Sequence, residues 1–199
     1  MLAGSGQERP SPYVHSVRRQ QAATDAEWSP GTISNRRDRV FAVLSTAGGF
    51  GFSPFAPGTA GTLPAVAIYL VIASLTPPDS QTVLIAVALA VSCILCVALG
   101  TWAERYWGRK DPRAFVLDEV AGYFLTVLLF RTSGVLATAV WAFFASRAFD
   151  VLKPWPASRM EPLPGGFGIL LDDLVASVYA AAFLHAVAYF LPWLFPSPM

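Results

Sequence analysis

The sequence predicts an all-α integral membrane protein, a helical bundle with short and in part re-entrant helices whose polar motifs lie in loops on one membrane face. Three observations carry this prediction. Apolar residues make up 54% of the 199 residues and charged residues 14%, with a mean hydropathy of +0.50, whereas a soluble domain is about 25% charged. Glycine, proline and charged residues divide the apolar part into segments of helical length. The carboxylates lie at the edges of these segments.

The chain begins with a segment of different composition. Residues 1–39 are rich in Ser, Gln, Pro, Arg and Asp and contain few large apolar residues. Such a segment cannot bury enough apolar surface to offset the entropy lost on ordering. We therefore expect residues 1–39 to be a disordered polar and basic tail, and residues 40–199 to form one membrane-embedded helical domain.

Six apolar segments follow in the membrane domain. Only the third and the sixth reach the roughly 20 residues that a straight span needs. We expect the other four to be tilted, re-entrant or interfacial, which leaves the number of true spans open. In order, the segments are Val40–Phe52, Leu63–Leu75, Thr82–Ala103, Asp118–Phe130, Gly134–Asp150 and Asp172–Leu194.

If the last five segments alternate in direction, their motif-bearing ends lie on one face of the membrane, which we call face X. This face receives the Ser53–Thr62 loop and every carboxylate at a segment edge. Lysine and arginine are enriched in cytoplasmic loops. We therefore expect a multi-pass protein of the cell inner membrane with its site facing the cytoplasm. Arg131 lies on the opposite face, whereas face X and its helix ends carry Arg105, Arg109, Lys110, Arg113, Arg147, Lys153 and Arg159.

Five carboxylates on face X are candidate metal ligands. A carboxylate at the centre of a membrane helix costs about 2.5–3.5 kcal/mol, so acidic residues are placed where water, a cation or a substrate reaches them. Two carboxylates about 4 Å apart repel by about 4 kcal/mol at an effective dielectric of about 20. A compensating cation is therefore expected, and an all-oxygen ligand set suits Mg²⁺ better than zinc. The candidates are Asp118, Glu119, Asp150, Asp172 and Asp173.

Two cations accompany Asp150. Arg147 lies three residues before it, on the same face of a helix end, and Lys153 follows just before Pro154 stops the helix. Arginine recognises phosphate with a planar fork and lysine with a point charge. The cluster can hold a metal and an anion, although ion pairs that merely anchor helix ends would leave the same pattern.

The Ser53–Thr62 loop is a candidate phosphate site ahead of a helix expected to begin near Leu63. Its glycines let backbone N–H groups turn toward an anion, and a helix N-terminus favours negative charge. The hydroxyls of Ser53, Thr59 and Thr62 add donors. An ordinary turn would show the same residues, just as Gly165-Gly166-Phe167-Gly168 could be only a flexible start to the last helix.

Taken together, these motifs resemble those of the phosphatidylglycerophosphatase A family. They occur in the family's order and with similar spacing, from about Gly48 to Ala176. The motifs are Ser53-Pro-x-x-Pro57-Gly58-Thr59-x-Gly61-Thr62, Asp118-Glu119-x-x-Gly122, Arg147-x-x-Asp150-x-x-Lys153-Pro154-Trp155-Pro156 and Gly165-Gly166-x-Gly168-Ile169-x-x-Asp172-Asp173.

The resemblance implies a helical, membrane-bound, Mg²⁺-dependent phosphatase. Its substrate would be phosphatidylglycerophosphate, which loses its terminal phosphate to give phosphatidylglycerol in phospholipid biosynthesis. We expect a metal-activated water as nucleophile, and an aspartyl-phosphate intermediate stays open. The implied metal-site or general-base residues are Asp118, Glu119, Asp150, Asp172 and Asp173, and the implied phosphate ligands are Arg147 and Lys153, supported by Ser53, Thr59 and Thr62.

Other functions fit the residues less well. A histidine-based lipid phosphatase needs two histidines near cations, whereas His15 lies in the tail and His185 in the last helix. A CDP-alcohol transferase would show an Asp-Gly-x-x-Ala-Arg run, which the sequence lacks. A net charge of +1 gives no field that favours nucleic acid. The alternative from another class is a small helical cation carrier or channel with acidic ion-binding residues, whose sites would lie near the membrane midplane.

Three further residues have structural interpretations. Cys93 and Cys96 lie inside an apolar helix without a second pair or a nearby histidine, so we expect them to pack rather than to bind metal. We expect His185 to make a structural hydrogen bond. The last apolar helix can anchor the chain or dimerise it, and a homo-oligomer is left open.

Overall fold

The structure is a computed structural model that describes residues 35–153, 155 and 165–195. Within these ranges the chain is helical and contains no strand, which confirms the all-α prediction. The elements are α2 (Arg36–Ser45), η1 (Phe50–Phe52), α3 (Pro57–Leu75), α4 (Pro78–Trp107), α5 (Leu117–Leu129), α6 (Val135–Leu152), α7 (Gly165–Phe190) and η3 (Pro192–Leu194).

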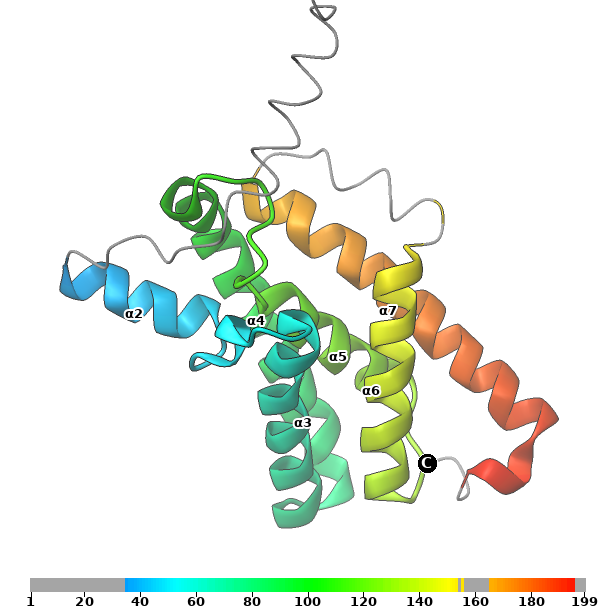
Figure 1. The fold of residues 1–199 in the computed structure, drawn as a ribbon. Helices are drawn as coiled ribbons and strands as arrows, with labels where there is room; N and C mark the ends of the chain where they lie inside the picture. The colour runs from blue at the N-terminus through cyan, green and yellow to red at the C-terminus, as the bar shows by residue number, and fades with distance from the viewer. Residues whose placement is uncertain (1–34, 154, 156–164, 196–199) are drawn as a thin grey trace, which may run out of the picture. The chain divides into compact units, whose positions relative to one another are not determined.

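Helix α2 begins inside the segment that the sequence assigns to the tail. Asn35 caps it, because the Asn35 Oδ1 atom accepts a hydrogen bond of 2.9 Å from the Asp38 backbone N–H. Residues 36–39 are therefore the first turn of a helix, so the disorder expected for these four residues is wrong. Residues 1–34 lie outside the described residues. Figure 1 shows α2 running across the direction of α3.

Four helices are long and apolar enough to cross a membrane: α3, α4, α6 and α7. The chain is thus a multi-pass membrane protein, but the expectation that only two segments reach spanning length is wrong. Helix α3 has 19 residues because it begins at Pro57, a residue whose fixed φ suits the first helical position. It thereby includes the glycines and threonines that the sequence places in a loop.

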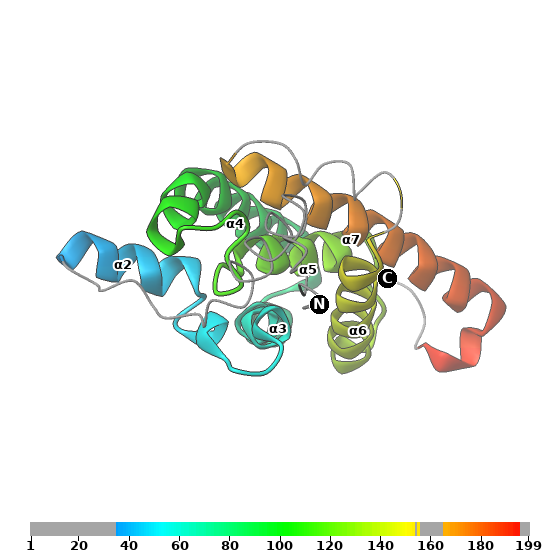
Figure 2. The same ribbon diagram turned by 45° about the horizontal axis from the view of Figure 1, so that its top comes forward.

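Helix α5 is too short to be among these spans, and it lies at the centre of the bundle. It packs against α3, α4, α6 and α7, as Figures 1 and 2 show. Most of its 13 residues are buried, including Asp118 in its first turn. The acidic residues of α5 are therefore held where the surrounding helices meet.

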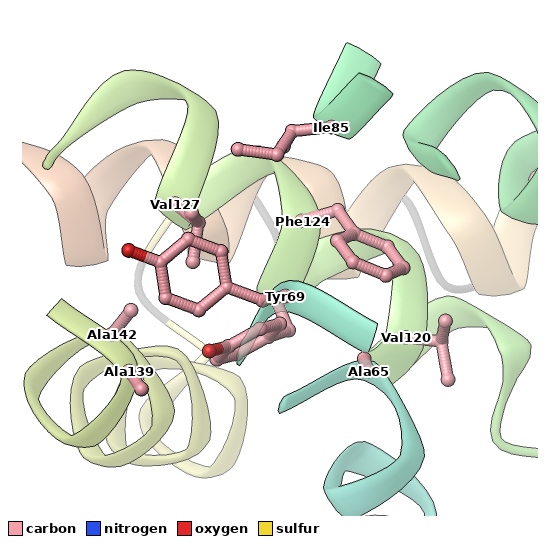
Figure 3. Close-up of a cluster of buried hydrophobic side chains, with 9 residues drawn as sticks. Ala65, Tyr69, Ile85, Val120, Phe124, Val127, Ala139 and Ala142 are labelled. Atoms are coloured by element: carbon pink, nitrogen blue, oxygen red, sulfur yellow. The ribbon is translucent and has the colours of Figure 1, made fainter. Parts of the chain in front are cut away.

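Small residues let these helices approach closely, which is how membrane helices pack in the absence of a hydrophobic driving force. Ala139 and Ala142 of α6 lie beside Tyr69 of α3 in one buried cluster with residues of α4 and α5 (Figure 3). Gly166 of α7 lies against the backbone carbonyl of Cys96 in α4, so a Cβ there would collide with it. The glycines before Asp172 thus belong to α7 and are not a flexible start, and Gly166 serves close packing against α4.

Candidate active site

A pocket of about 360 Å³ opens where the ends of the helices meet. The start of α3 contributes Gly58 to its lining, the α4–α5 loop Arg109 and Arg113, and the other helices their acidic residues. The starts of α3 and α5, the end of α6, the α4–α5 loop and Asp173 of α7 therefore converge, as the alternation of segments predicts. The expectation that Asp172 and Asp173 begin the last helix is wrong, because α7 begins at Gly165 and both residues lie inside it. The acidic residues that line the pocket are Asp111, Asp118, Glu119, Asp150 and Asp173.

Three carboxylates in this pocket lie close enough together to bind one metal ion. Asp118, Glu119 and Asp173 each offer one oxygen, and these three oxygens all lie within 4.8 Å of one another. Asp118 and Asp173 are buried. Asp118 and Glu119 come from α5 and Asp173 from α7, so the packing of these two helices creates the group.

Arg147 holds the carboxylates of three helices together. Its Nη1 atom lies 3.6 Å from Glu119 Oε1, and its Nη2 atom lies 3.2 Å from Asp150 Oδ2 and 3.7 Å from Asp173 Oδ2. The guanidinium is largely buried, with 13% of the side chain exposed. A partly buried charge network of this kind depends strongly on each of its members.

Asp172 pairs with Lys153 and, unlike the other four predicted acidic residues, does not line the pocket. Lys153 donates a hydrogen bond of 2.6 Å from Nζ to Asp172 Oδ2. Burial by itself lowers the pKa of Lys153, but the hydrogen bond and the charge of Asp172 outweigh it and the pKa is raised. Lys153 lines the pocket, whereas Asp172 lies behind it as the residue that holds Lys153 in place.

Of the Ser53–Thr62 motif, the backbone reaches the pocket rather than the hydroxyls. A Cβ on Gly58 would collide with Glu119 Oε1 and lie 2.8 Å from Arg147 Nη1, so a larger residue here would displace these two side chains of the site. Ser53 donates to the Phe55 carbonyl, and Thr62 is buried and donates to the Gly58 carbonyl. Thr59 is exposed and does not line the pocket.

The chemistry of the acidic group suits a hard divalent cation. Asp118 Oδ1 and Glu119 Oε2 are buried and have no hydrogen-bond partner among the described residues. These two carboxyls lie outside the four candidate spans, and burial raises the pKa of both. A cation bound between them would compensate the charge and occupy the unpartnered oxygens, as oxygen-ligated Mg²⁺ does.

Two residues of the pocket are absent from the site that the sequence predicts. The sequence identifies Arg109 and Arg113 only as basic residues of face X, yet both line the pocket beside the acidic group. Their spacing is the signal: positions 109, 111 and 113 line the pocket, whereas Lys110 and Pro112 between them do not. Alternate residues of a loop can point to the same side, but the sequence does not show to which side, because that depends on the conformation of the turn.

Other predictions concern residues away from the pocket. Cys96 is fully buried and packs between α4 and α7, and neither cysteine is in a disulfide, so the packing interpretation of Cys93 and Cys96 is confirmed. His185 Nε2 forms a hydrogen bond of 3.0 Å with the carbonyl of Leu129, which confirms its structural role. Pro154 and Pro156 of the motif lie outside the described residues.

The fold and the pocket define a class, that of helical membrane proteins with a polar site built from carboxylates and arginines at one end of the bundle. A family model described as Phosphatidylglycerophosphatase A matches residues 43–188. The chain belongs to the phosphatidylglycerophosphatase A family, and it is an enzyme that hydrolyses phosphoric monoesters.

Individual relatives agree with the family match. A phosphatidylglycerophosphatase A of Haemophilus influenzae is 32% identical over 151 residues, which cover 75% of this chain and 89% of that protein. The Escherichia coli phosphatidylglycerophosphatase A is 28% identical over 151 residues, covering 75% and 84%. A Bacteroides thetaiotaomicron protein with the provisional name phosphatidylinositol-3-phosphatase is 38% identical over 143 residues, covering 69% and 87%. No solved structure matches the chain.

Proposed function

We propose that the chain is a Mg²⁺-dependent phosphatidylglycerophosphatase of phospholipid biosynthesis, which hydrolyses phosphatidylglycerophosphate to phosphatidylglycerol and phosphate. The observation that carries this proposal is the convergence of three carboxylate oxygens within 4.8 Å of one another, beside Arg147, in a pocket at the helix ends. A headgroup phosphate can reach such a pocket without leaving the membrane surface. We place it on the cytoplasmic face of the inner membrane, because lysine and arginine gather in its loops.

The proposed roles follow from position. Asp118, Glu119 and Asp173 would hold Mg²⁺, which when bound would neutralise charge on the phosphoryl oxygens and lower the pKa of a nearby water. Arg147 keeps the carboxylates oriented from the other side. Of the five predicted metal or general-base residues, Asp150 lines the pocket outside the converging three and is the candidate base, and Asp172 supports Lys153.

The reaction consumes one water and breaks one P–O ester bond. Oxygen of the water bonds to phosphorus while the glycerol oxygen leaves with the electron pair of the broken bond. Asp150 would accept a proton from the attacking water, and the leaving oxygen takes a proton from solvent water to become the free hydroxyl of phosphatidylglycerol. Asp150 then returns its proton to solvent, so that the protons balance. Arg147 and Lys153 would balance negative charge that builds on the transferring group.

The names of the relatives suggest two candidate substrates, which an experiment has to distinguish. Phosphatidylglycerophosphate and phosphatidylinositol 3-phosphate both carry a phosphomonoester on the polyol of a phosphatidyl lipid, and the relatives carry names for one or the other. We favour phosphatidylglycerophosphate because the family model and two relatives carry that name. Both lipids belong in the test.

The test is phosphate release by the purified chain in detergent micelles. Each lipid is presented with Mg²⁺, with EDTA, and with EDTA followed by excess Mg²⁺. We expect fast release from phosphatidylglycerophosphate that EDTA abolishes and Mg²⁺ restores. Faster release from phosphatidylinositol 3-phosphate would move the substrate to that lipid, and EDTA-resistant turnover would overturn the Mg²⁺ proposal. Cation flux in liposomes without any phosphate release would favour the carrier or channel instead.

A further inference from the structure

The cations that the sequence assigns to phosphate are already engaged with carboxylates. Both terminal nitrogens of Arg147 face carboxylates, and Lys153 Nζ lies 2.6 Å from Asp172 Oδ2. These pairs keep the acidic residues in position, so they have limited freedom to bind a second anionic group. A lipid with two phosphates therefore needs further cations near the pocket.

Arg109 and Arg113 supply two such cations at the pocket. Helix α4 ends at Trp107, its C-cap Gly108 has a left-handed φ of 66°, and Asp111 is left-handed as well with φ 45°. These turns bring alternate residues of the loop to the pocket, so that Arg109 and Arg113 line it and Lys110 does not. The loop is closed by a hydrogen bond of 2.8 Å from the Phe115 N–H to the Pro112 carbonyl.

The two arginines differ from Arg147 in burial and in pairing. Both are exposed, and neither forms an ion pair with any residue in the part of the chain that the structure describes. An exposed arginine with its fork unoccupied can receive a phosphate in a bidentate geometry without first breaking a salt bridge. The pocket thus has a deep acidic part, centred on buried Asp118 and Asp173, and a basic part at its exposed edge.

This arrangement suits a lipid headgroup that carries two phosphates, a terminal phosphomonoester and an inner phosphodiester. The phosphomonoester to be hydrolysed has to reach the carboxylates, while the phosphodiester that joins the polyol to the diacylglycerol stays nearer the membrane surface. A cavity of 360 Å³ is at the lower end of the roughly 300–1,000 Å³ of small-molecule pockets, and it is large enough for more than one phosphate group.

We propose that Arg109 and Arg113 bind the phosphodiester of the lipid headgroup, so that the enzyme selects lipids with a phosphomonoester and a phosphodiester on one polyol over lipids with a single phosphate. This inference rests on the proposed function. It assigns substrate selection to the α4–α5 loop and leaves the hydrolysis itself to the carboxylates and Arg147.

The test compares phosphatidylglycerophosphate with phosphatidic acid, whose only phosphate is a monoester on the diacylglycerol. Both are assayed in the same micelles with Mg²⁺, for the unmodified chain and for the Arg109→Ala, Arg113→Ala double variant. We expect the KM for phosphatidylglycerophosphate to rise about tenfold or more while kcat stays within about twofold. Hydrolysis of phosphatidic acid should not change, so the selectivity should fall by the same factor.

Lys110→Ala is the matched control, because it removes the same charge from the same loop at a position that does not line the pocket. It should leave KM and selectivity unaltered. The double Arg→Lys variant, which keeps the charge and loses the fork, should recover part of the selectivity.

Several results would overturn the inference. An equal loss of kcat on both lipids would place the arginines at the reacting phosphate, and an unchanged selectivity would remove them from substrate recognition. An effect of Lys110→Ala equal to that of the arginine variant would indicate a general surface charge. If the unmodified chain released no phosphate from phosphatidylglycerophosphate, the proposed function itself would fail, a result distinct from a change in selectivity.

Discussion

Lys153 Nζ lies 2.6 Å from Asp172 Oδ2, and this pair joins the C-terminal end of α6 to α7 beside the pocket. Lys153 is the C-terminal cap of α6, with a left-handed φ of 40° that points the chain out of the helix. Asp172 is buried, whereas about a third of Lys153 is exposed, with 30% of its side chain open to solvent. The pair thus holds a pocket cation in place through a carboxylate that does not itself line the pocket.

A double-mutant cycle should detect this coupling. Asp172→Asn alone leaves Lys153 without its charge partner, and Lys153→Met alone leaves Asp172 buried and uncompensated. The double variant removes both charges, so its loss of stability should be smaller than the sum of the single losses by about 1–3 kcal/mol. Thermal unfolding in detergent measures this difference. Additive losses would mean that the two side chains do not interact.

Asp150→Asn and Asp173→Asn should each stop turnover and leave the fold intact. Each change removes one charge from the pocket with almost no change in volume, so we expect kcat to fall by about 100-fold or more. Phosphate release in Mg²⁺ measures the effect, and retained micelle-soluble protein checks the fold. Asp79→Asn, an exposed aspartate at the start of α4, is the control. Near-normal activity of either pocket variant would remove that residue from the site.

Arg147→Lys should be almost as damaging as the loss of a carboxylate. The arginine contacts carboxylates of three helices through two nitrogens, whereas an ammonium is one point charge and cannot span them. We expect kcat to fall by about 100-fold and the apparent affinity for Mg²⁺ to fall as well, because the carboxylates are no longer held in one arrangement. A Mg²⁺ titration of activity measures both. Arg105→Lys, at an exposed position late in α4, should have no effect.

Two glycines of α3 should differ in what an added methyl group does. In Gly58→Ala the new Cβ meets Glu119 Oε1, so activity should fall on the order of 10²-fold through misplacement of the site, with little change in stability. In Gly61→Ala the new Cβ meets the side chain of Val116, so stability should fall by about 1–3 kcal/mol through overpacking. Comparison of kcat with the unfolding midpoint separates the two. Equal losses of activity and stability in both variants would contradict this division.

Cysteine labelling in intact cells should place the pocket on one side of the membrane. In a background with Cys93→Ala and Cys96→Ala, which we expect to keep activity, Thr59→Cys and Lys110→Cys should be protected from an impermeant thiol reagent until the cells are permeabilised. Ser133→Cys should react from outside. All three positions are exposed, and the first two neighbour residues that line the pocket. Labelling of Thr59→Cys from outside would place the pocket away from the cytoplasm.

The sequence predicts that the α3 motif, the α5 acidic residues, the end of α6 and the Asp172-Asp173 pair lie together, because breakers between apolar segments make the chain alternate. The pocket contains residues of all four, although Asp173 lies inside α7 and not at its start. The sequence predicts the first residues of the helices less accurately, because α3 and α7 both begin earlier than expected. Gly58 has low helix propensity, yet it lies in the first turn of α3, where it fits against Glu119. Close approach between helices outweighs local propensity here. The same reason moves the start of α7 to Gly165, ahead of the close contact between Gly166 and α4.

From sequence alone, composition determined the class of protein, and the order of charged and apolar residues determined which loops share a face. Only the tertiary structure decided the partners within the site. Asp172 and Asp173 are adjacent in the chain, but consecutive residues of a helix point about 100° apart. Asp173 therefore joins Asp118 and Glu119, while Asp172 turns to Lys153. The side chain that each residue meets depends on the rotation of packed helices, which the sequence pattern does not specify.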